Sequence, residues 1–441
     1  MLLMDQDQSE EAFNLSEMAR ARTFLDRLGN VRTDLLKTAS PQLINDSREL
    51  ETKLNSLEQR WERLDSENDG TLNAKYAVAQ RQYEDLLMRM KVANASIASS
   101  SVKTLKLPEI QKLLDTDTTL LSYFVLPEET FAFVITQHSF QAIKIPINEA
   151  YLNRKITWLR RFASTRELPS EDLRLLYCWL ICPVKSYLKT RTVCIVPHRE
   201  LDYLPFAALS DGRTYLNDQH TLFYLPSASA LTFVHNRKKP AAGPALVLAQ
   251  SRAVRLQVLD SVDEEADVVA GLYHTSALKG AKAVKSTFLE RAPRSSLIHI
   301  AAHANLVATS PFFFRIMLAK DQDGTAALQL RDIYNLDLSN ASLVVLSACQ
   351  TNLGGEHRLG DDFEALNRAF LTAGARTVIA SMWAVNDEAT RDLMKLFYTN
   401  LKRGMSRAEA LRIAQSETRL KHSHPYYWAG FVLTGDPGKI D

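Results

Sequence analysis

The sequence has few cysteines and no long apolar run. Only four of its 441 residues are cysteine. Cys178, Cys182 and Cys194 lie in apolar stretches and lack the spacing of a disulfide framework or a metal site. No stretch approaches the roughly 18 uninterrupted apolar residues of a membrane span, and residues 1–4 are too short and lack the basic residues of a secretory signal. We therefore expect a cytoplasmic protein with no membrane partner.

An excess of charge of one sign is also missing. The 53 Lys and Arg residues against 51 Asp and Glu leave a net charge of +2. This balance gives no electrostatic basis for direct binding of nucleic acid or membrane, so we expect a protein substrate. With 46% hydrophobic and 24% charged residues, the chain is ordinary globular protein, long enough for more than one domain.

Motifs for phosphate, metal and cofactor binding are absent as well. The chain has neither a Gly-rich phosphate loop nor a Gly-x-Ser-x-Gly elbow. A phosphatase would place an arginine six positions after Cys349, where this chain has Gly355. His299 and His303 would be about 13 Å apart on one strand, too far to bind the same ion. We expect neither a metal nor a cofactor.

Two apolar runs that are present each end in a residue useful for catalysis. Residues 297–303 end in His303, and residues 343–349 end in Cys349. Both runs are typical of buried strands of a parallel sheet, whose carboxyl ends line one crevice. A thiol with a pKa of about 8.5 becomes an effective nucleophile beside an imidazole. The alternative is a buried cysteine that acts as a small apolar residue next to a hydrogen-bonded core histidine.

Around these residues the sequence resembles the CHAT-domain peptidases, caspase-like cysteine proteases related to separases and caspases. The resemblance implies that His303 is the general base and Cys349 the nucleophile of peptide-bond cleavage, and that His299 is structural or orienting. It also implies a role in a bacterial defence or cell-death pathway. The matching stretches are residues 299–303, 346–351, 369–374, 380–385, 426–431 and 435–436, within weaker similarity from about 105 to 437.

The same resemblance predicts how an oxyanion would be bound. Backbone N–H groups near Cys349 and Ala304 would stabilise the negative charge that develops on the substrate carbonyl oxygen. Family members usually have glycine where this chain has Ala304. Alanine keeps the N–H group but restricts the backbone.

Candidate substrate-pocket residues follow the second half of the resemblance. Trp383 and Asp387 resemble a position that lines the first specificity pocket of caspase-like enzymes, where Asp387 would select a basic residue. A solvated helix N-cap is the alternative interpretation of Asp387. Asp361 and Asp362 are further candidates for the pocket.

A helical prefix is expected over residues 1–100. A turn at 65–70 makes the last two predicted helices a hairpin. Its apolar seam is either ordinary packing or a docking surface for a partner helix. Residues 17–25 look like the end of the helical-repeat arrays that precede CHAT domains, so a helical-repeat (TPR-like) activator or regulatory subunit would come from another chain. The predicted seam residues are Leu15, Met18, Ala21, Leu25, Leu28, Leu50, Leu54, Leu57, Trp61, Leu64, Leu72, Tyr76, Ala79, Tyr83, Leu86 and Met90.

The remainder is predicted to be α/β in two halves. Residues 105–238 contain a β-meander at 118–126, 131–136 and 140–145, helices at 151–162 and 171–188, and a strand at 193–196; they resemble the pseudo-protease half of separases. After a polar, Pro/Gly-punctuated linker at 236–244, residues 239–441 alternate strands and helices. This alternation predicts a caspase-like, mainly parallel sheet flanked by helices.

Together these features predict a cysteine endopeptidase that works through an acyl-enzyme and is regulated by a partner or effector. The alternative is a weak or inactive caspase-like scaffold, for which Ala304 is the main support.

Overall fold

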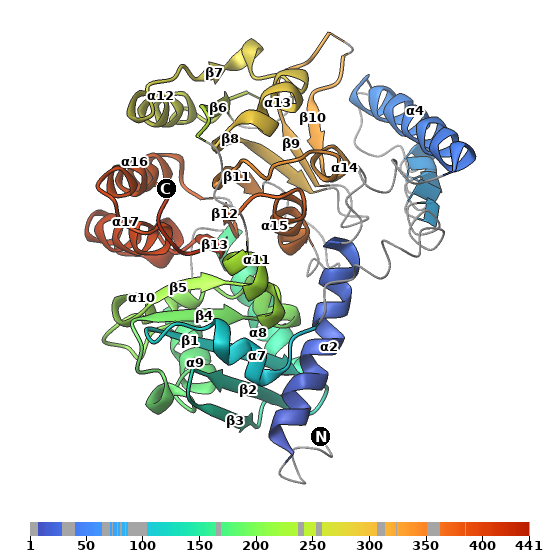
Figure 1. Ribbon diagram of the computed structural model, residues 1–441. Coiled ribbons are helices and arrows are strands. Elements are labelled where there is room, and N and C mark those ends of the chain that lie inside the picture. The colour runs from blue at the N-terminus through green and yellow to red at the C-terminus, as the bar shows by residue number, and fades with distance from the viewer. Residues whose placement is uncertain are drawn as a thin grey trace.

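The computed structural model describes residues 8–28, 40–63, 71–72, 74–76, 78–79, 82–83, 85–86, 104–164, 169–236, 242–252, 258–306, 314–322, 324–350, 362–383 and 385–440. Within these ranges, no helix is both long and apolar enough to cross a lipid bilayer. The chain has three parts: two N-terminal helical elements, an N-terminal half (residues 104–236) and a C-terminal half (residues 242–440) (Figure 1).

The N-terminal half contains the expected meander and a parallel set of strands. β1, β2 and β3 pair antiparallel, whereas β1, β4 and β5 are parallel. The helix predicted to reach residue 188 ends at Leu180, because Pro183 restricts the chain before it. The elements are α7 (Leu107–Leu113), β1 (Thr118–Val125), β2 (Thr130–Ile135), β3 (Phe140–Ile145), α8 (Glu149–Ser164), α9 (Ser170–Leu180), β4 (Thr192–Val196), α10 (Leu216–Gln219), β5 (Thr221–Tyr224) and α11 (Leu231–Asn236).

The C-terminal half alternates strands and helices as predicted. β6, β8, β11 and β12 are parallel, and two short antiparallel strands, β9 and β10, were not predicted. The elements are β6 (Ala245–Gln250), α12 (Val262–Leu272), β7 (Leu278–Lys279), α13 (Lys285–Arg291), β8 (Leu297–Leu306), β9 (Phe314–Met317), β10 (Ala327–Gln329), α14 (Leu330–Tyr334), β11 (Leu343–Gln350), α15 (Asp362–Thr372), β12 (Thr377–Ser381), α16 (Asp387–Lys402), α17 (Arg407–Lys421) and β13 (Phe431–Gly435).

One sheet runs through both halves. Its order is β10-β9-β8-β11-β12-β13-β5-β4-β1-β2-β3, with β6 beside β8 and β7 beside β6. The halves join where Thr434 of β13 pairs in parallel with Tyr224 of β5. Helices cover both faces; around the C-terminal half, α12, α16 and α17 lie on one side and α14 and α15 on the other (Figure 1). The predicted α/β class with a mainly parallel, helix-flanked sheet is confirmed.

Helix α2 (Ser9–Leu28) packs on the N-terminal half. Phe13 is fully buried in the main core, and its ring meets Phe133 edge-on at 5.3 Å between centroids. The predicted seam of this helix is wrong, because Leu15 and Met18 are 49% and 55% exposed. Ala21, Leu25 and Leu28 have side chains outside the described part of the chain. Helix α2 therefore belongs to the core of the N-terminal half.

Polar anchors explain why α2 turns this face inward. Glu17 is buried, and its Oε2 accepts hydrogen bonds from the backbone N–H of Ser229 at 3.0 Å and its hydroxyl at 3.1 Å. Arg20 donates to the Val196 carbonyl at 3.3 Å and also to the carbonyl of Tyr123. The hydrogen bonds of Glu17 and Arg20 contribute more to stability than burial of Leu15 and Met18 on the opposite face would.

The predicted helical hairpin is confirmed and has its own core. We use this name for α4 (Pro41–Arg63) and the helical residues described between 71 and 86. The Tyr83 hydroxyl donates to Oε1 of Glu51 at 2.9 Å, which ties the two helices together. Trp61, Leu64 and Met90 lie outside the side chains described. The buried seam comprises Leu54, Leu57, Leu72, Tyr76, Ala79 and Tyr83, with Leu50 packed against it.

Candidate active site

His303 and Cys349 occupy neighbouring strands in register. β8 and β11 run parallel from Leu297 opposite Leu343 to Ala304 opposite Gln350, and this register pairs His303 with Cys349. Adjacent strands lie about 4.8 Å apart. The fold thus brings together two residues from runs that are far apart in the sequence, and it does so at the carboxyl ends of parallel strands, where ligands bind in α/β sheets.

His303 also marks a change of neighbour on the other edge of β8. β6 pairs in parallel with β8 up to Gln250 opposite Ala302. From His303 onward the neighbour is β9, which runs antiparallel and places Met317 opposite His303. The His303 side chain is buried in this arrangement.

The strand that carries His303 is longer than the sequence predicts. β8 continues to Leu306, because β9 supplies a partner that the sequence did not reveal. Ala304 consequently pairs with Gln350 on one side and with Ile316 on the other. The backbone N–H of Ala304, the predicted oxyanion donor, therefore points toward one of two paired strands in this arrangement.

His299 is held in a buried polar cluster beneath the same sheet face. Its Nδ1 lies 3.0 Å from the Tyr398 hydroxyl, and its Nε2 lies 3.1 Å from Oε1 of Glu265. Burial raises the pKa of Tyr398 well above its usual range, so the phenol stays protonated.

The contacts of His299 support a structural role. They tie β8 to α12 through Glu265 and to α16 through Tyr398. Positions 299 and 303 are about 13 Å apart along one strand, so His299 does not contact the His303 ring. Sequence reasoning missed both partners, since Tyr398 is 99 positions away from His299 and no local pattern marks either of them.

Trp383 lies at the same edge of the sheet as Cys349. The register of β11 and β12 pairs Leu346 with Ala380, and Trp383 follows two residues after the carboxyl end of β12. The indole is buried and its Nε1 donates to the Tyr426 carbonyl at 3.0 Å. Gly430 packs on this ring, where an added Cβ would lie 3.0 Å from Trp383 Cε2. Trp383 therefore forms a fixed wall at this edge.

Asp387 is the first residue of α16 and is half-buried. Its Oδ2 accepts a hydrogen bond from the Ser261 backbone N–H at 3.1 Å. Burial, with smaller contributions from the nearby carboxylates of Glu265 and Asp260, raises its pKa above the usual value. The alternative of an N-cap role is wrong, because Asn386 is the N-cap and accepts from the Ala389 N–H.

The structure describes the two other candidate pocket residues only in part. Asp361 lies outside the described residues, and Asp362 begins α15 with its side chain outside them. The predicted apolar surroundings of two other cysteines are wrong: Cys178, on α9, and Cys182, in the turn after it, are both exposed. Cys194 is buried, and burial raises the pKa of its thiol.

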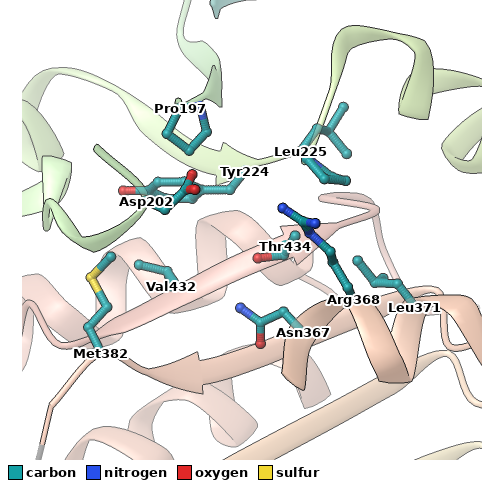
Figure 2. Close-up of a pocket in the computed structure, with 11 residues that line it drawn as sticks. Pro197, Asp202, Tyr224, Leu225, Asn367, Arg368, Leu371, Met382, Val432 and Thr434 are labelled. Atoms are coloured by element: carbon teal, nitrogen blue, oxygen red, sulfur yellow. The ribbon is translucent and has the colours of Figure 1, made fainter. Parts of the chain in front are cut away.

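A small cavity lies between the two halves, beside α15 (Figure 2). Asn367 and Arg368 approach it from α15, and Tyr224 and Asp202 from the N-terminal half. Its volume is about 40 Å³. At about 10–15 Å³ for each water, it holds a few water molecules and is too small for a peptide. This cavity is therefore not the substrate site.

The chain is similar to known proteins over more than half of its length. A family model described as "CHAT domain" matches residues 170–436, more than half of the chain. Tetratricopeptide repeat protein 28 of Mus musculus is 28% identical over 336 residues, which cover 62% of this chain and 14% of that protein. The Homo sapiens protein of the same name is 28% identical over 332 residues, which cover 61% and 13%. The chain thus spans a small part of these relatives.

The fold is also found among solved structures. Two crystal structures of the Saccharomyces cerevisiae separase–securin complex match with TM-scores of 0.50 and 0.54, covering 94% of this chain and 40% of that chain. Sequence identity is 8% in both cases, so the likeness concerns the fold alone.

Proposed function

This chain belongs to the CHAT domain family, and on that premise we propose that it is a cysteine endopeptidase that cleaves a protein substrate in the cytoplasm. The observation that carries the proposal is the register that pairs Cys349 with His303 at the carboxyl ends of β11 and β8. A thiol and an imidazole on neighbouring parallel strands are the two groups that acyl transfer by a cysteine requires. No cofactor is needed for this reaction.

The proposed reaction has two steps. His303 takes the proton of the Cys349 thiol, and the sulfur attacks the scissile carbonyl carbon to form a tetrahedral intermediate. The proton then passes from His303 to the leaving amine as the C–N bond breaks. In the second step a water, deprotonated by His303, hydrolyses the acyl-enzyme and returns the thiol. Backbone N–H groups of Cys349 and Ala304 are the proposed oxyanion donors.

The proposed determinant of substrate choice is the Asp387 carboxyl at the start of α16. We propose that Asp387 selects Lys or Arg before the scissile bond, with Trp383 as the apolar wall that contacts the side-chain stem. The raised pKa of Asp387 supports this role, because a cationic side chain placed beside the carboxyl would stabilise its charged form. Asp361 and Asp362 stay alternative candidates.

Partners of this chain are also part of the proposal. The relatives are named for tetratricopeptide repeats, and the structural neighbour is a complex of separase with securin. A helical-repeat activator or regulatory subunit is therefore the partner class that we propose. The pathway implied by the sequence resemblance, bacterial defence or cell death, is proposed on that resemblance alone.

A non-catalytic scaffold is the second candidate, and one observation favours it. Ala304 has a paired strand on each side, whereas an oxyanion donor has to face the substrate. An electrophilic peptide separates the two functions. A peptidase gains a covalent label on Cys349 that is lost in His303→Ala, and a scaffold gains no more label on Cys349 than on the exposed Cys178.

Cleavage itself is tested by incubating the purified chain with a proteome extract and mapping new amino termini by mass spectrometry. Cys349→Ala removes the nucleophile, and Cys178→Ala is the matched control because its thiol is exposed and distant from the pair. We expect new termini with the wild type and Cys178→Ala and none with Cys349→Ala. The same set of termini from all three proteins would contradict the proposal.

A further inference from the structure

Tyr76 of the helical hairpin reaches the C-terminal half at the edge of its sheet. Its hydroxyl donates a hydrogen bond to Oε1 of Gln329 at 3.1 Å. The Arg315 guanidinium carbon lies 5.7 Å from the centroid of the Tyr76 ring, within cation–π range. Tyr76, Gln329 and Arg315 are only 5%, 4% and 3% exposed. The contact therefore excludes water, although the hairpin has an apolar core of its own.

The residues that Tyr76 contacts lead directly to the candidate active site. Gln329 ends β10 and pairs with Arg315 of β9. The same strand β9 pairs with β8, where Met317 lies opposite His303 and Ile316 opposite Ala304. The hairpin is thus bonded, through Tyr76 and Gln329 of β10, to the strand pair whose member β9 covers the edge of β8 at His303 and Ala304.

Covering this edge opposes the proposed reaction. Ala304 has partners on both sides, so a substrate reaches the edge of β8 at this point only when the β8–β9 pairing opens. β9 and β10 have four and three residues, which is short for an independently stable pair of strands. A buried contact from outside the sheet adds stability to a pairing of this size.

We infer that the helical hairpin is an autoinhibitory latch, with Tyr76 holding β10 and β9 in place over His303 and Ala304. This inference rests on the proposed peptidase function and names the regulation of the same site. A helical-repeat partner that draws the hairpin away from Gln329 and Arg315 frees β9, and the opened edge of β8 then admits the substrate.

The test compares two tyrosines of the same hairpin. Tyr76→Phe removes the hydrogen bond to Gln329 and keeps the ring. Tyr83→Phe is the matched control, because that hydroxyl is bonded to Glu51 within the hairpin at 2.9 Å. Backbone amide hydrogen exchange is followed at residues 314–317 and 327–329, together with the alkylation rate of Cys349 by iodoacetamide and the turnover of a substrate found by terminus mapping.

Tyr76→Phe should speed exchange in both segments, alkylation of Cys349 and turnover by about fivefold, the population shift expected from loss of one ordinary hydrogen bond. Tyr83→Phe should leave all three rates within twofold. Gln329→Leu should be at least as fast as Tyr76→Phe, because it removes the same bond and also the side-chain cap of α14. Adding Tyr76→Phe to Gln329→Leu should give no further increase, because the bond to Tyr76 is already lost.

The two proposals fail in different ways. Unchanged hydrogen exchange in the folded Tyr76→Phe protein overturns the latch, whatever the turnover. Equal acceleration by Tyr76→Phe and Tyr83→Phe also overturns it, because the effect is then general loosening of the hairpin. Faster exchange in both strands of Tyr76→Phe, without turnover in any variant, upholds the mechanical coupling and contradicts the peptidase function.

Discussion

Each half of the sheet has a cysteine on a parallel strand and a histidine on or just after one, but they are arranged differently. In the N-terminal half, Cys194 is on β4 and His198 follows it four residues later on the same segment. In the C-terminal half, Cys349 and His303 are on neighbouring strands in register. Four residues of extended chain separate two side chains by about 13 Å, whereas adjacent strands are about 4.8 Å apart. Only the second arrangement can form a catalytic pair.

The environments of the two N-terminal residues are also unsuited to catalysis. Burial raises the pKa of the Cys194 thiol. Burial, together with the charges of Arg20 and Arg199, lowers the pKa of His198 to about 3, and its Nδ1 accepts the Val125 backbone N–H at 3.0 Å. This thiol and this imidazole are both neutral near pH 7.

The carboxyl ends of the N-terminal strands are, in addition, filled by the chain itself. Arg20 of α2 donates to the carbonyl of Val196, the last residue of β4, and to Ser122 Oγ of β1 at 3.2 Å. In the C-terminal half, β9 instead pairs along the edge of β8 at His303. The comparison teaches that residue types alone do not place two side chains together, because strand register also has to match.

The largest expected effect on activity comes from replacing the two histidines one at a time. His303→Ala should lower kcat by about 10²-fold or more, as expected for loss of a positioned general base. His198→Ala should leave kcat within about twofold, since that ring has no reacting partner. Steady-state rates on one fixed peptide substrate give both values, with folding checked by thermal melting. Equal losses in both variants would remove the distinction between the halves.

A large effect on stability is expected from Phe13, because α2 is part of the N-terminal core. Phe13→Ala removes a fully buried ring and should destabilise the fold by about 3–5 kcal/mol. Leu15→Ala, on the exposed face of the same helix, should cost less than about 0.5 kcal/mol. Urea unfolding measures both. Similar costs would show that α2 is not anchored as described.

An ion-pair network that joins the two halves should give a pH-dependent effect. Glu409 of α17 accepts hydrogen bonds from Arg412 of the same helix at 2.9 Å, Thr221 of β5 at 2.7 Å and Arg191 at 2.6 Å. The bonds from Arg412, followed by those from Thr221 and Arg191, hold its pKa at about 2. Because the folded pKa is below the ordinary value of about 4.3, the stabilisation is present above that value and lost as the pH falls toward 2.

Glu409→Gln should therefore destabilise the protein by about 1–2 kcal/mol at pH 7, a value reduced by partial solvent exposure. The difference from the wild type should narrow between pH 5 and pH 3. Thermal melts at these three pH values provide the measurement. A difference that is constant with pH would mean that the carboxylate charge does not contribute.

The smallest expected effect concerns Asp387, whose ionised form is disfavoured by burial. A folded pKa above the unfolded one costs stability above that pKa, so Asp387→Asn should raise Tm at pH 7 by about 1–2 °C. It should also lower cleavage after Lys and Arg by about tenfold. Glu388→Gln, at the next and exposed position, should change neither property. Unchanged cleavage after Lys and Arg in Asp387→Asn would contradict the assignment of Asp387 to the substrate pocket.

Local apolar patterns were sufficient to predict most of the architecture. The buried runs that became β6, β8, β11 and β12 are continuous and flanked by polar residues, and the meander of β1 to β3 alternates around clear turns. Those patterns depend on neighbours in the sequence, and so the α/β class and the positions of His303 and Cys349 at one end of the strands could be predicted.

Features that depend on distant partners could not be predicted. β9 and β10 are too short to show a period, and β9 contains the charged Arg315, which is buried only because the sheet and Tyr76 surround it. The inward face of α2 carries Glu17 and Arg20, polar residues whose partners lie more than a hundred positions away. His299 likewise gains its role from Glu265 and Tyr398. Each of these errors came from a tertiary contact.

The most direct test of the account is the pH dependence of Cys349 alkylation by iodoacetamide, followed by peptide mass mapping. Cys178 and Cys182 are exposed internal references in the same protein. We predict that Cys349 reacts with a midpoint at least about one pH unit below the ordinary thiol value of about 8.5, and that His303→Ala raises this midpoint. A midpoint at or above 8.5 that is unchanged in folded His303→Ala would contradict the thiol–imidazole pair.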